Sequence, residues 1–252
     1  MVASGTIEAS VKDGVGEICF FHPKGNSLPG ELLRGLASQV DKFGEDSSVK
    51  VVLLKSQGDR AFCAGASFDE FLAIDDLEGS RNFFSGFAHL ILAMRRCPKF
   101  VVARVQGKVV GGGVGIAAAA DYALATVESS VRLSELALGI GPFIIGPAVR
   151  RKMGMSAFGQ MAVDADWHDS AWAREKGLFA EVYPDIDSLD KGVVELMQKL
   201  TEYNPEAMEQ LKTVLWEGTE DWEELVHARV EVTARLVLTD FVKNTVSKIK
   251  NR

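Results

Sequence analysis

The stretch from Arg104 to Asp121, RVQGKVVGGGVGIAAAAD, constrains the fold of this chain more than any other. An apolar run leads into three consecutive glycines, and small or apolar residues typical of a helix follow at once. Glycine lets a backbone approach another group closely, and the first N–H groups of a helix have no partner within that helix. The stretch is therefore typical of a buried strand followed by a helix start that attracts a negatively charged oxygen.

Three interpretations of the glycines differ in the ligand that they predict. A phosphate-binding loop would need Gly-Lys-Ser/Thr after the glycines, and the chain continues with Val114 and Gly115 instead. A dinucleotide fingerprint matches at Gly113, Gly115 and Ala118, but it normally joins strand to helix by a tight turn, and here QGKVVGG intervenes. An oxyanion hole would use backbone N–H groups to hold a carbonyl oxygen, and the small residues of AFCAGASF could supply its second donor. The simplest structural alternative for both loops is a tight turn with close helix packing.

Strand patterns alternate with helix patterns over most of the chain. TIEASVKDGVGEICFF predicts a hairpin that turns at Asp13-Gly14. A helix follows, with Ser27 as its N-cap and Gly44 as its stop. The continuous apolar runs in VKVVLLKS and KFVVARVQG predict strands that are buried on both faces. This alternation predicts an α/β fold with mostly parallel strands, and no repeat is evident in the sequence.

From about Asp187 the pattern becomes helical and charged. We expect a core over residues 1–195 and a C-terminal helical segment over 196–252 that serves in oligomerisation.

Composition narrows the possible partners and the compartment. The formal net charge of −7 argues against nucleic-acid binding. Three cysteines do not suggest a disulfide framework, and the histidines show no metal-binding spacing. The N-terminal MVASGTIEASVKDG predicts no signal peptide, and no uncharged apolar run approaches the roughly 18 residues of a membrane span. We expect a cytoplasmic protein with no metal, nucleic-acid or membrane partner.

Two loops and a following glutamate together resemble a known family. RAFCAGASFDEF, VQGKVVGGGVGIAAAADYALA and LSELALGIG, in this order and spacing, resemble the crotonase (enoyl-CoA hydratase/isomerase) superfamily over nearly the whole chain. The resemblance implies a spiral of ββα units and a C-terminal helical region that builds homotrimers, often paired as hexamers. It also implies acyl-CoA thioester substrates, an enolate-like intermediate and no cofactor beyond the CoA of the substrate.

Matched position by position, the resemblance implies roles for individual residues. Ala66 and Gly112 match the two oxyanion-hole positions, and Glu135 matches a catalytic acid/base. The remaining positions that it assigns to substrate or CoA binding are Lys24, Ala64, Gly65, Phe68, Gly111, Gly113, Phe143, Ile144 and Phe241.

The family's hydratases carry a first glutamate where this chain has Gly115. One carboxylate suffices to shuttle a proton, as in the enoyl-CoA isomerases, whereas hydration usually needs a second group that orients water. We expect an enoyl-CoA hydratase, in its most specific form a 3-methylglutaconyl-CoA hydratase. An enoyl-CoA isomerase is the alternative within the family. An acyl-CoA or acyl-carrier-protein binding protein without full catalysis is the alternative outside enzymes.

Overall fold

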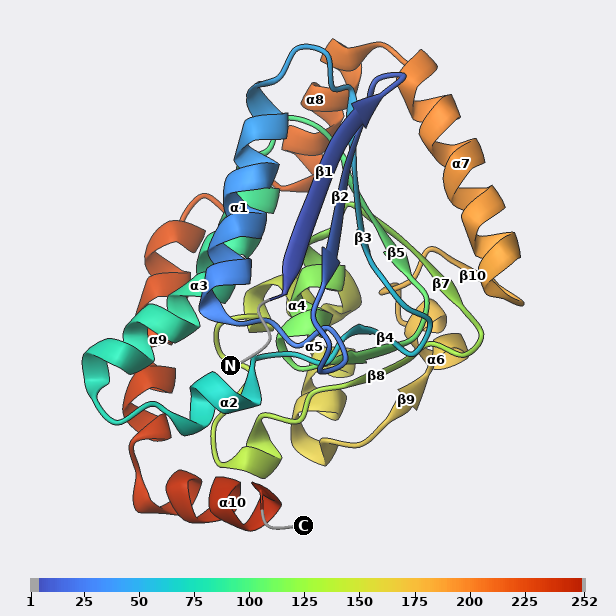
Figure 1. Ribbon diagram of the computed structural model, residues 1–252. Coiled ribbons are helices and arrows are strands. Elements are labelled where there is room, and N and C mark those ends of the chain that lie inside the picture. The colour runs from blue at the N-terminus through green and yellow to red at the C-terminus, as the bar shows by residue number, and fades with distance from the viewer. Residues whose placement is uncertain (1–4, 251–252) are drawn as a thin grey trace.

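Two sheets organise residues 5–250, which are the residues that the computed structural model describes (Figure 1). The larger sheet has the order β1-β2-β3-β5-β7-β10, and the smaller has the order β4-β6-β8-β9. From β2 to β10 and from β4 to β8 all neighbouring strands are parallel, whereas β1 and β9 pair antiparallel at the edges. The strands are β1 (Thr6–Lys12), β2 (Val15–Phe21), β3 (Val51–Ser56), β4 (Ala61–Cys63), β5 (Val101–Val105), β6 (Lys108–Val110), β7 (Tyr122–Thr126), β8 (Ser130–Arg132), β9 (His168–Asp169) and β10 (Glu181–Tyr183).

The helices complete a repeated unit that the sequence does not reveal. They are α1 (Gly30–Glu45), α2 (Phe68–Leu72), α3 (Leu77–Arg96), α4 (Gly112–Ala119), the 3-10 helix η1 (Leu136–Leu138), α5 (Gly146–Asp164), α6 (Ser170–Glu175), α7 (Ile186–Glu202), α8 (Pro205–Leu215), α9 (Trp222–Val237) and α10 (Asp240–Lys250). A strand of the large sheet, a strand of the small sheet and a longer helix occur in this order three times, as β3-β4-α3, β5-β6-α4 and β7-β8-α5, with the short helices α2 and η1 preceding α3 and α5. This arrangement confirms the predicted α/β fold and its spiral of ββα units.

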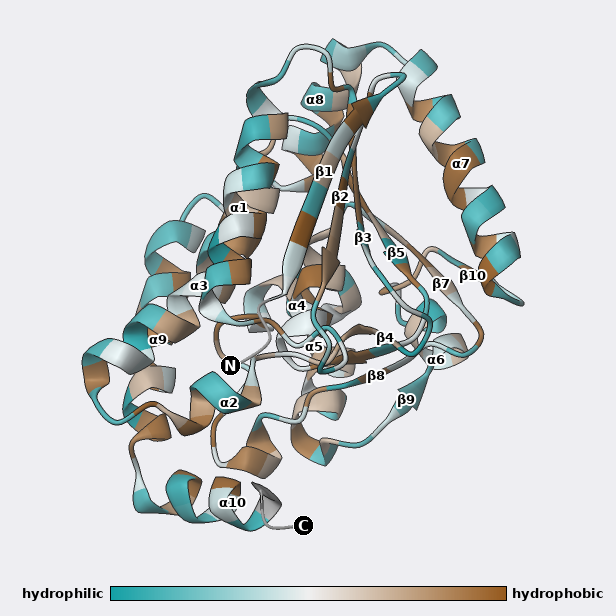
Figure 2. Cartoon of the chain, viewed as in Figure 1, coloured by the Kyte–Doolittle hydropathy of each residue, from teal (hydrophilic) through white to brown (hydrophobic). Residues whose placement is uncertain are grey.

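Strand β3 shows why the large sheet is covered on both faces. Successive side chains of a strand point to opposite faces. Val52 and Leu54 belong to the main core, which α1 and α3 cover, whereas Val51 and Leu53 pack with Leu189 of α7. Because both faces are buried, the strand is apolar at consecutive positions, as its sequence predicted. Helix α7 lies over the second face and carries both hydrophilic and hydrophobic residues along its length (Figure 2).

The hairpin is confirmed, but both predicted ends of the first helix are wrong. Helix α1 begins at Gly30, with Pro29 rather than Ser27 at its N-cap. The Gly30 N–H donates to Glu70 Oε2 at 2.7 Å, so a side chain of α2 caps this helix. Gly44 lies inside the last turn of α1. A cap supplied by a distant segment leaves no local sequence signal, and local cues alone therefore misplaced the start.

The helical C-terminal part begins with α7, close to the position that the sequence indicated. Helix α7 runs without interruption through residue 195, and the division of the chain there stays a prediction. Helix α9 packs along α3 (Figure 1). Within residues 5–250, no helix is long and apolar enough to cross a membrane.

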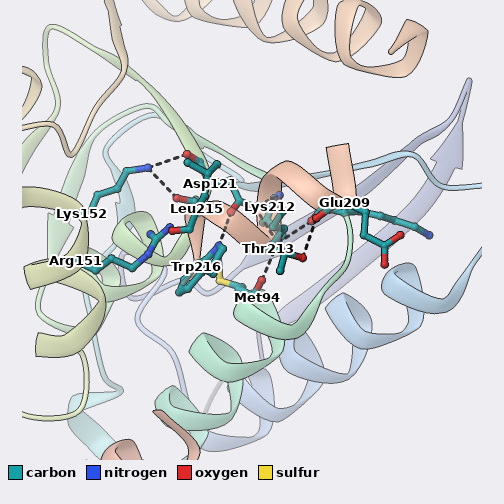
Figure 3. Close-up of polar contacts among 12 residues, drawn as sticks. Met94, Asp121, Arg151, Lys152, Glu209, Lys212, Thr213, Leu215 and Trp216 are labelled. Carbon is teal, nitrogen blue, oxygen red and sulfur yellow. Dashed lines mark hydrogen bonds and ion pairs between the residues drawn. The ribbon is translucent and has the colours of Figure 1, made fainter. Parts of the chain in front are cut away.

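A buried ion pair joins α8 to the core (Figure 3). Lys212 Nζ lies 2.9 Å from Asp121 Oδ2, and the two side chains are only 3% and 4% exposed. Lys212 also donates to the carbonyls of Met94 and Lys99, while Trp216 Nε1 donates to Asp121 Oδ1 at 2.8 Å. Since these charges are paired and hydrogen-bonded, their burial is tolerated. The cluster fixes α8 at the end of α3 and at the turn before β7.

We expect Lys212→Met to lower the free energy of unfolding by about 3 kcal/mol, because Asp121 would remain buried without its counter-ion. Urea-induced unfolding at a fixed protein concentration measures this loss. Lys176→Met is the matched control, since Lys176 pairs with an exposed Glu175, and we expect it to cost less than about 1 kcal/mol. A loss for Lys212→Met as small as that of the control would contradict a structural role for the buried pair.

Candidate active site

Three loops converge at one edge of the small sheet. Strands β4, β6 and β8 are adjacent and parallel, so their carboxyl ends lie side by side. Ala66 follows β4, Gly112 follows β6 and Glu135 follows β8. Residues from separate segments of the sequence are thereby brought to one place, as is common at the carboxyl ends of parallel strands.

Two glycines allow the first two loops to come into contact. Gly65 has φ +87°, and a Cβ there would lie 2.9 Å from the carbonyl oxygen of Val110. Gly111 has φ +54° and ψ −121°, a conformation open to glycine. Its N–H donates to the carbonyl of Arg132 at 2.8 Å, which ties this loop to β8. Both loops are therefore held by main-chain contacts that a larger residue would disturb.

The same contacts leave two N–H groups available. Leu28 donates to the carbonyl of Gly65 at 2.8 Å and accepts from the N–H of Ser67 at 3.0 Å, so its bonds flank Ala66 without using the Ala66 N–H. Gly112 is the first residue of α4 and has no acceptor in the preceding turn. Among the residues that the structure describes, neither the Ala66 nor the Gly112 N–H has an acceptor. Such donors suit an oxygen on which negative charge develops.

The converging loops border a cavity of about 350 Å³. The residues predicted from the sequence that line it are Lys24, Ala64, Gly65, Ala66, Phe68, Gly111, Gly112, Glu135, Phe143 and Ile144. Two predicted residues lie elsewhere. Gly113 packs against Cys63, and a Cβ at Gly113 would lie 2.8 Å from the Cβ of Cys63. Phe241 of α10 is 67% exposed, and its ring packs on Gly139.

Part of the cavity wall was missed by sequence reasoning. Gly141, Pro142 and Ile145 also line the cavity and belong to the apolar stretch GPFIIGPA, which the family resemblance assigned to the acyl pocket. The lining residues that sequence reasoning missed are Ser27, Phe71, Phe84, Phe87, Val110, Ser134, Leu138, Ile140 and Thr233. Helical spacing in SRNFFSGFAHL marks the Phe84 side of α3 as buried, but spacing alone does not tell a core from a cavity wall. Thr233 comes from α9, which the sequence indicated only as part of a helical segment.

Glu135 is the one lining residue with a carboxyl group in the described part of the chain. Its Oε2 is buried and has no hydrogen-bond partner among the described residues. Its Oε1 would lie 3.1 Å from a Cβ at Gly111, so the carboxyl group faces the glycine loop. Burial raises the pKa of Glu135 to about 7. A carboxyl group with this pKa can both take up and release a proton near neutral pH.

Gly115 is closely packed, and there is no room beside it for a side chain. A Cβ at this position would lie 2.5 Å from Cβ and Cγ2 of Ile145. The place that a side chain of residue 115 would occupy is therefore filled by the residue that precedes α5. The glycine is required by the close packing of α4 on α5.

The polar rim of the cavity is formed by Lys24, which is ion-paired with Asp69. The Lys24 side chain is 62% exposed, so its ammonium lies on the solvent side. Within the described residues, no group of three His, Cys, Asp or Glu side chains could hold a metal ion.

Comparison with known proteins identifies the family. The enoyl-CoA hydratase/isomerase family model matches residues 10–247, and the chain belongs to this family. YngF of Bacillus subtilis, which carries the name of an enoyl-CoA hydratase/isomerase, is 29% identical over 77% of this chain and 75% of its own. Human mitochondrial methylglutaconyl-CoA hydratase is 27% identical over 77% of this chain and 58% of its own. A crystal structure of an enoyl-CoA hydratase from Bacillus halodurans superposes with a TM-score of 0.89 at 19% identity, covering 96% of this chain and 99% of that one. The crotonase fold expected from the loops is thereby confirmed.

We expect Gly111→Ala to reduce activity strongly, because the new Cβ would be strained at positive φ and would crowd the Glu135 carboxyl group. The initial rate with an enoyl-CoA thioester measures this effect. Gly218→Ala is the matched control: Gly218 also has a positive φ, but a Cβ there meets nothing within 4 Å. Equal activity of the two variants would show that contact with Glu135 is unimportant.

A second prediction concerns pH and stability. Because the pKa of Glu135 is raised from 4.5 to about 7 in the folded state, the unfolded chain loses this proton first as pH rises. The free energy of unfolding should therefore fall between these pH values, by about 3 kcal/mol at the most. We expect Glu135→Gln to remove this fall, so that its stability relative to wild type is greater at about pH 8 than at about pH 5. Urea unfolding of both proteins at both pH values measures the difference, and a constant difference would argue against a raised pKa.

Proposed function

We propose that this protein is an enoyl-CoA enzyme in which Glu135 alone moves a proton at a thioester enolate. The observation that carries this proposal is one buried carboxyl group, with a pKa of about 7, that lines the same cavity as Ala66 and Gly112 with their two available N–H groups. In this proposal the N–H groups bind the thioester oxygen. Each such donor contributes about 3 kcal/mol to transition-state stabilisation in comparable sites.

Isomerisation of a 3-enoyl to a 2-enoyl thioester uses only these groups. The Glu135 carboxylate removes a proton from C2, and the electron pair of that C–H bond moves into the thioester to form a dienolate. The two N–H groups stabilise the negative oxygen. The protonated Glu135 then returns the proton to C4, and the double bond forms between C2 and C3. No atom is gained or lost, and the carboxylate is regenerated.

The packing around Gly115 favours isomerisation over hydration. Hydration needs water to be held for attack at C3, and the family's first glutamate is absent from this chain. Ile145 fills the space next to Gly115, and no second carboxyl group lines the cavity in the described residues. Isomerisation requires a single acid/base, which is what the cavity offers.

Hydration is the second candidate, because relatives with 25–29% identity carry hydratase names. In that case Glu135 would have to orient the water and also transfer the proton. The 3-methylglutaconyl thioester is the most specific form of this candidate, on the similarity to the human enzyme.

We further propose that CoA lies across the cavity rim at Lys24, and that the helical segment over 196–252 forms homotrimers or hexamers. The exposed ammonium of Lys24 suits a phosphate or pantetheine oxygen. The exposed ring of Phe241 is available to a CoA bound by a neighbouring subunit.

We expect the purified protein to convert 3-hexenoyl-CoA to 2-hexenoyl-CoA and to hydrate 2-hexenoyl-CoA poorly. Chromatographic separation of the thioesters measures both reactions in one sample. Glu135→Gln should lose about 100-fold or more of the isomerase rate. Glu128→Gln, a change at an exposed glutamate in the turn before β8, should retain it. Rapid hydration without isomerisation would favour the second candidate, and binding of the thioester without either reaction would favour a binding protein.

A further inference from the structure

We infer that the acyl group bound in this cavity is an uncharged hydrocarbon chain and that an acyl group ending in a carboxylate is rejected. The inference rests on the proposed function, since it takes the cavity to be the acyl site. It selects among acyl thioesters and argues against the 3-methylglutaconyl thioester as the substrate.

Aromatic rings from several elements form much of the cavity wall. Phe84 and Phe87 come from α3, Phe71 comes from α2, and Phe143 follows η1. Phe71 and Phe84 pack edge to face, with ring centroids 6.0 Å apart. Phe84 and Phe87 are only 6% and 3% exposed, so their positions are fixed by the core. A wall of this kind offers dispersion contacts to a chain and no hydrogen bond.

Apart from Lys24 and Glu135, the polar side chains among the described lining residues are neutral hydroxyl groups, and two of them have partners. Thr233 Oγ1 donates to the carbonyl of Arg229 at 3.1 Å. Ser27 Oγ lies 3.2 Å from His22 Nδ1. Ser134 is the third neutral hydroxyl among the described lining residues. None of these groups supplies a positive charge to a carboxylate.

Lys24 is the one cation among the described lining residues. In the proposed function it lies at the rim beside the CoA, and not at the far end of the acyl chain. Its side chain is 62% exposed and is already paired with Asp69. Apart from Lys24, Glu135 is the one ionisable group among the described lining residues that a carboxylate within the cavity would meet. When both carboxyl groups are ionised, their repulsion adds to the loss of hydration.

The cost of burying an unpaired carboxylate then decides the selectivity. Removing an ionised carboxylate from water without a counter-ion or donors is so unfavourable that such groups become protonated instead. A methyl group at the same position gains contact with the aromatic wall. The cavity therefore distinguishes two acyl chains of equal length by the charge at their far end.

The test compares binding of hexanoyl-CoA and adipoyl-CoA to the protein by titration calorimetry. These saturated thioesters have the same number of acyl carbons and differ in the terminal carboxylate, and neither can be turned over by the proposed reaction. We expect hexanoyl-CoA to bind at least about 100-fold more tightly at neutral pH. Equal binding, or tighter binding of adipoyl-CoA, would overturn the inference.

Two variants of Thr233 test the same acyl-chain selectivity by changing the cavity wall and not the ligand. Thr233→Lys places an ammonium in the wall and should reduce the preference for hexanoyl-CoA about 10-fold or more. Thr233→Val, which is similar in size and uncharged, should keep it. The melting temperature of each variant checks that it folds. If Thr233→Lys does not fold, the binding of the two thioesters to the wild-type protein decides the question.

The binding test of the acyl-chain selectivity and the activity test of the proposed function can give different results. Preference for hexanoyl-CoA without conversion of 3-hexenoyl-CoA would overturn the proposed reaction and support the inferred selectivity. Failure of both saturated thioesters to bind would overturn the selectivity and the acyl-CoA site together.

Discussion

The site depends on how closely the backbone after β4 can approach the backbone after β6. Gly65 makes this approach possible, because a Cβ there would come within 2.9 Å of the Val110 carbonyl oxygen. The main chains of the two loops then lie against each other, with the N–H groups of Ala66 and Gly112 left without acceptors in the described structure. Glu135 joins them because β8 lies next to β6 in the same parallel sheet. Glycine contacts between two loops and the order of strands in the small sheet thus bring three segments together.

The sequence predicted the glycine stretch as a candidate site, but it did not predict the contacts that require each glycine. The sequence suggested that glycines at 111–113 let a ligand touch the main chain. The structure adds that Gly112 faces the ring of Phe87 and that Gly115 faces Ile145. These contacts join residues that no local pattern pairs. For the same reason, local patterns correctly predicted the hairpin and the buried strands, yet misplaced the start of α1, which Glu70 caps from another segment.

Burial links the proposed chemistry to the stability of the fold. The apolar wall that suits an acyl chain also keeps water from the carboxyl group of Glu135 and raises its pKa to about 7. A buried carboxyl oxygen without a partner is unfavourable for folding, and proteins retain such groups chiefly where they serve a function. Most of the core contains no such group, and the large sheet is covered by aliphatic and aromatic packing on both faces. Ser80 Oγ and Gln106 Oε1 are also buried without a partner among the described residues, so the fold accommodates a few such positions besides Glu135.

The loops proposed to carry the chemistry and the wall proposed to choose the acyl chain come from different parts of the chain. The loops follow the strands of the small sheet, whereas many residues of the wall belong to α2, α3 and α9. Thr233 reaches the cavity from a helix that is distant in sequence from all three loops. A substitution on α9 can therefore alter the range of accepted acyl groups while the catalytic geometry stays intact. Such modularity would let one reaction diversify over many substrates during evolution.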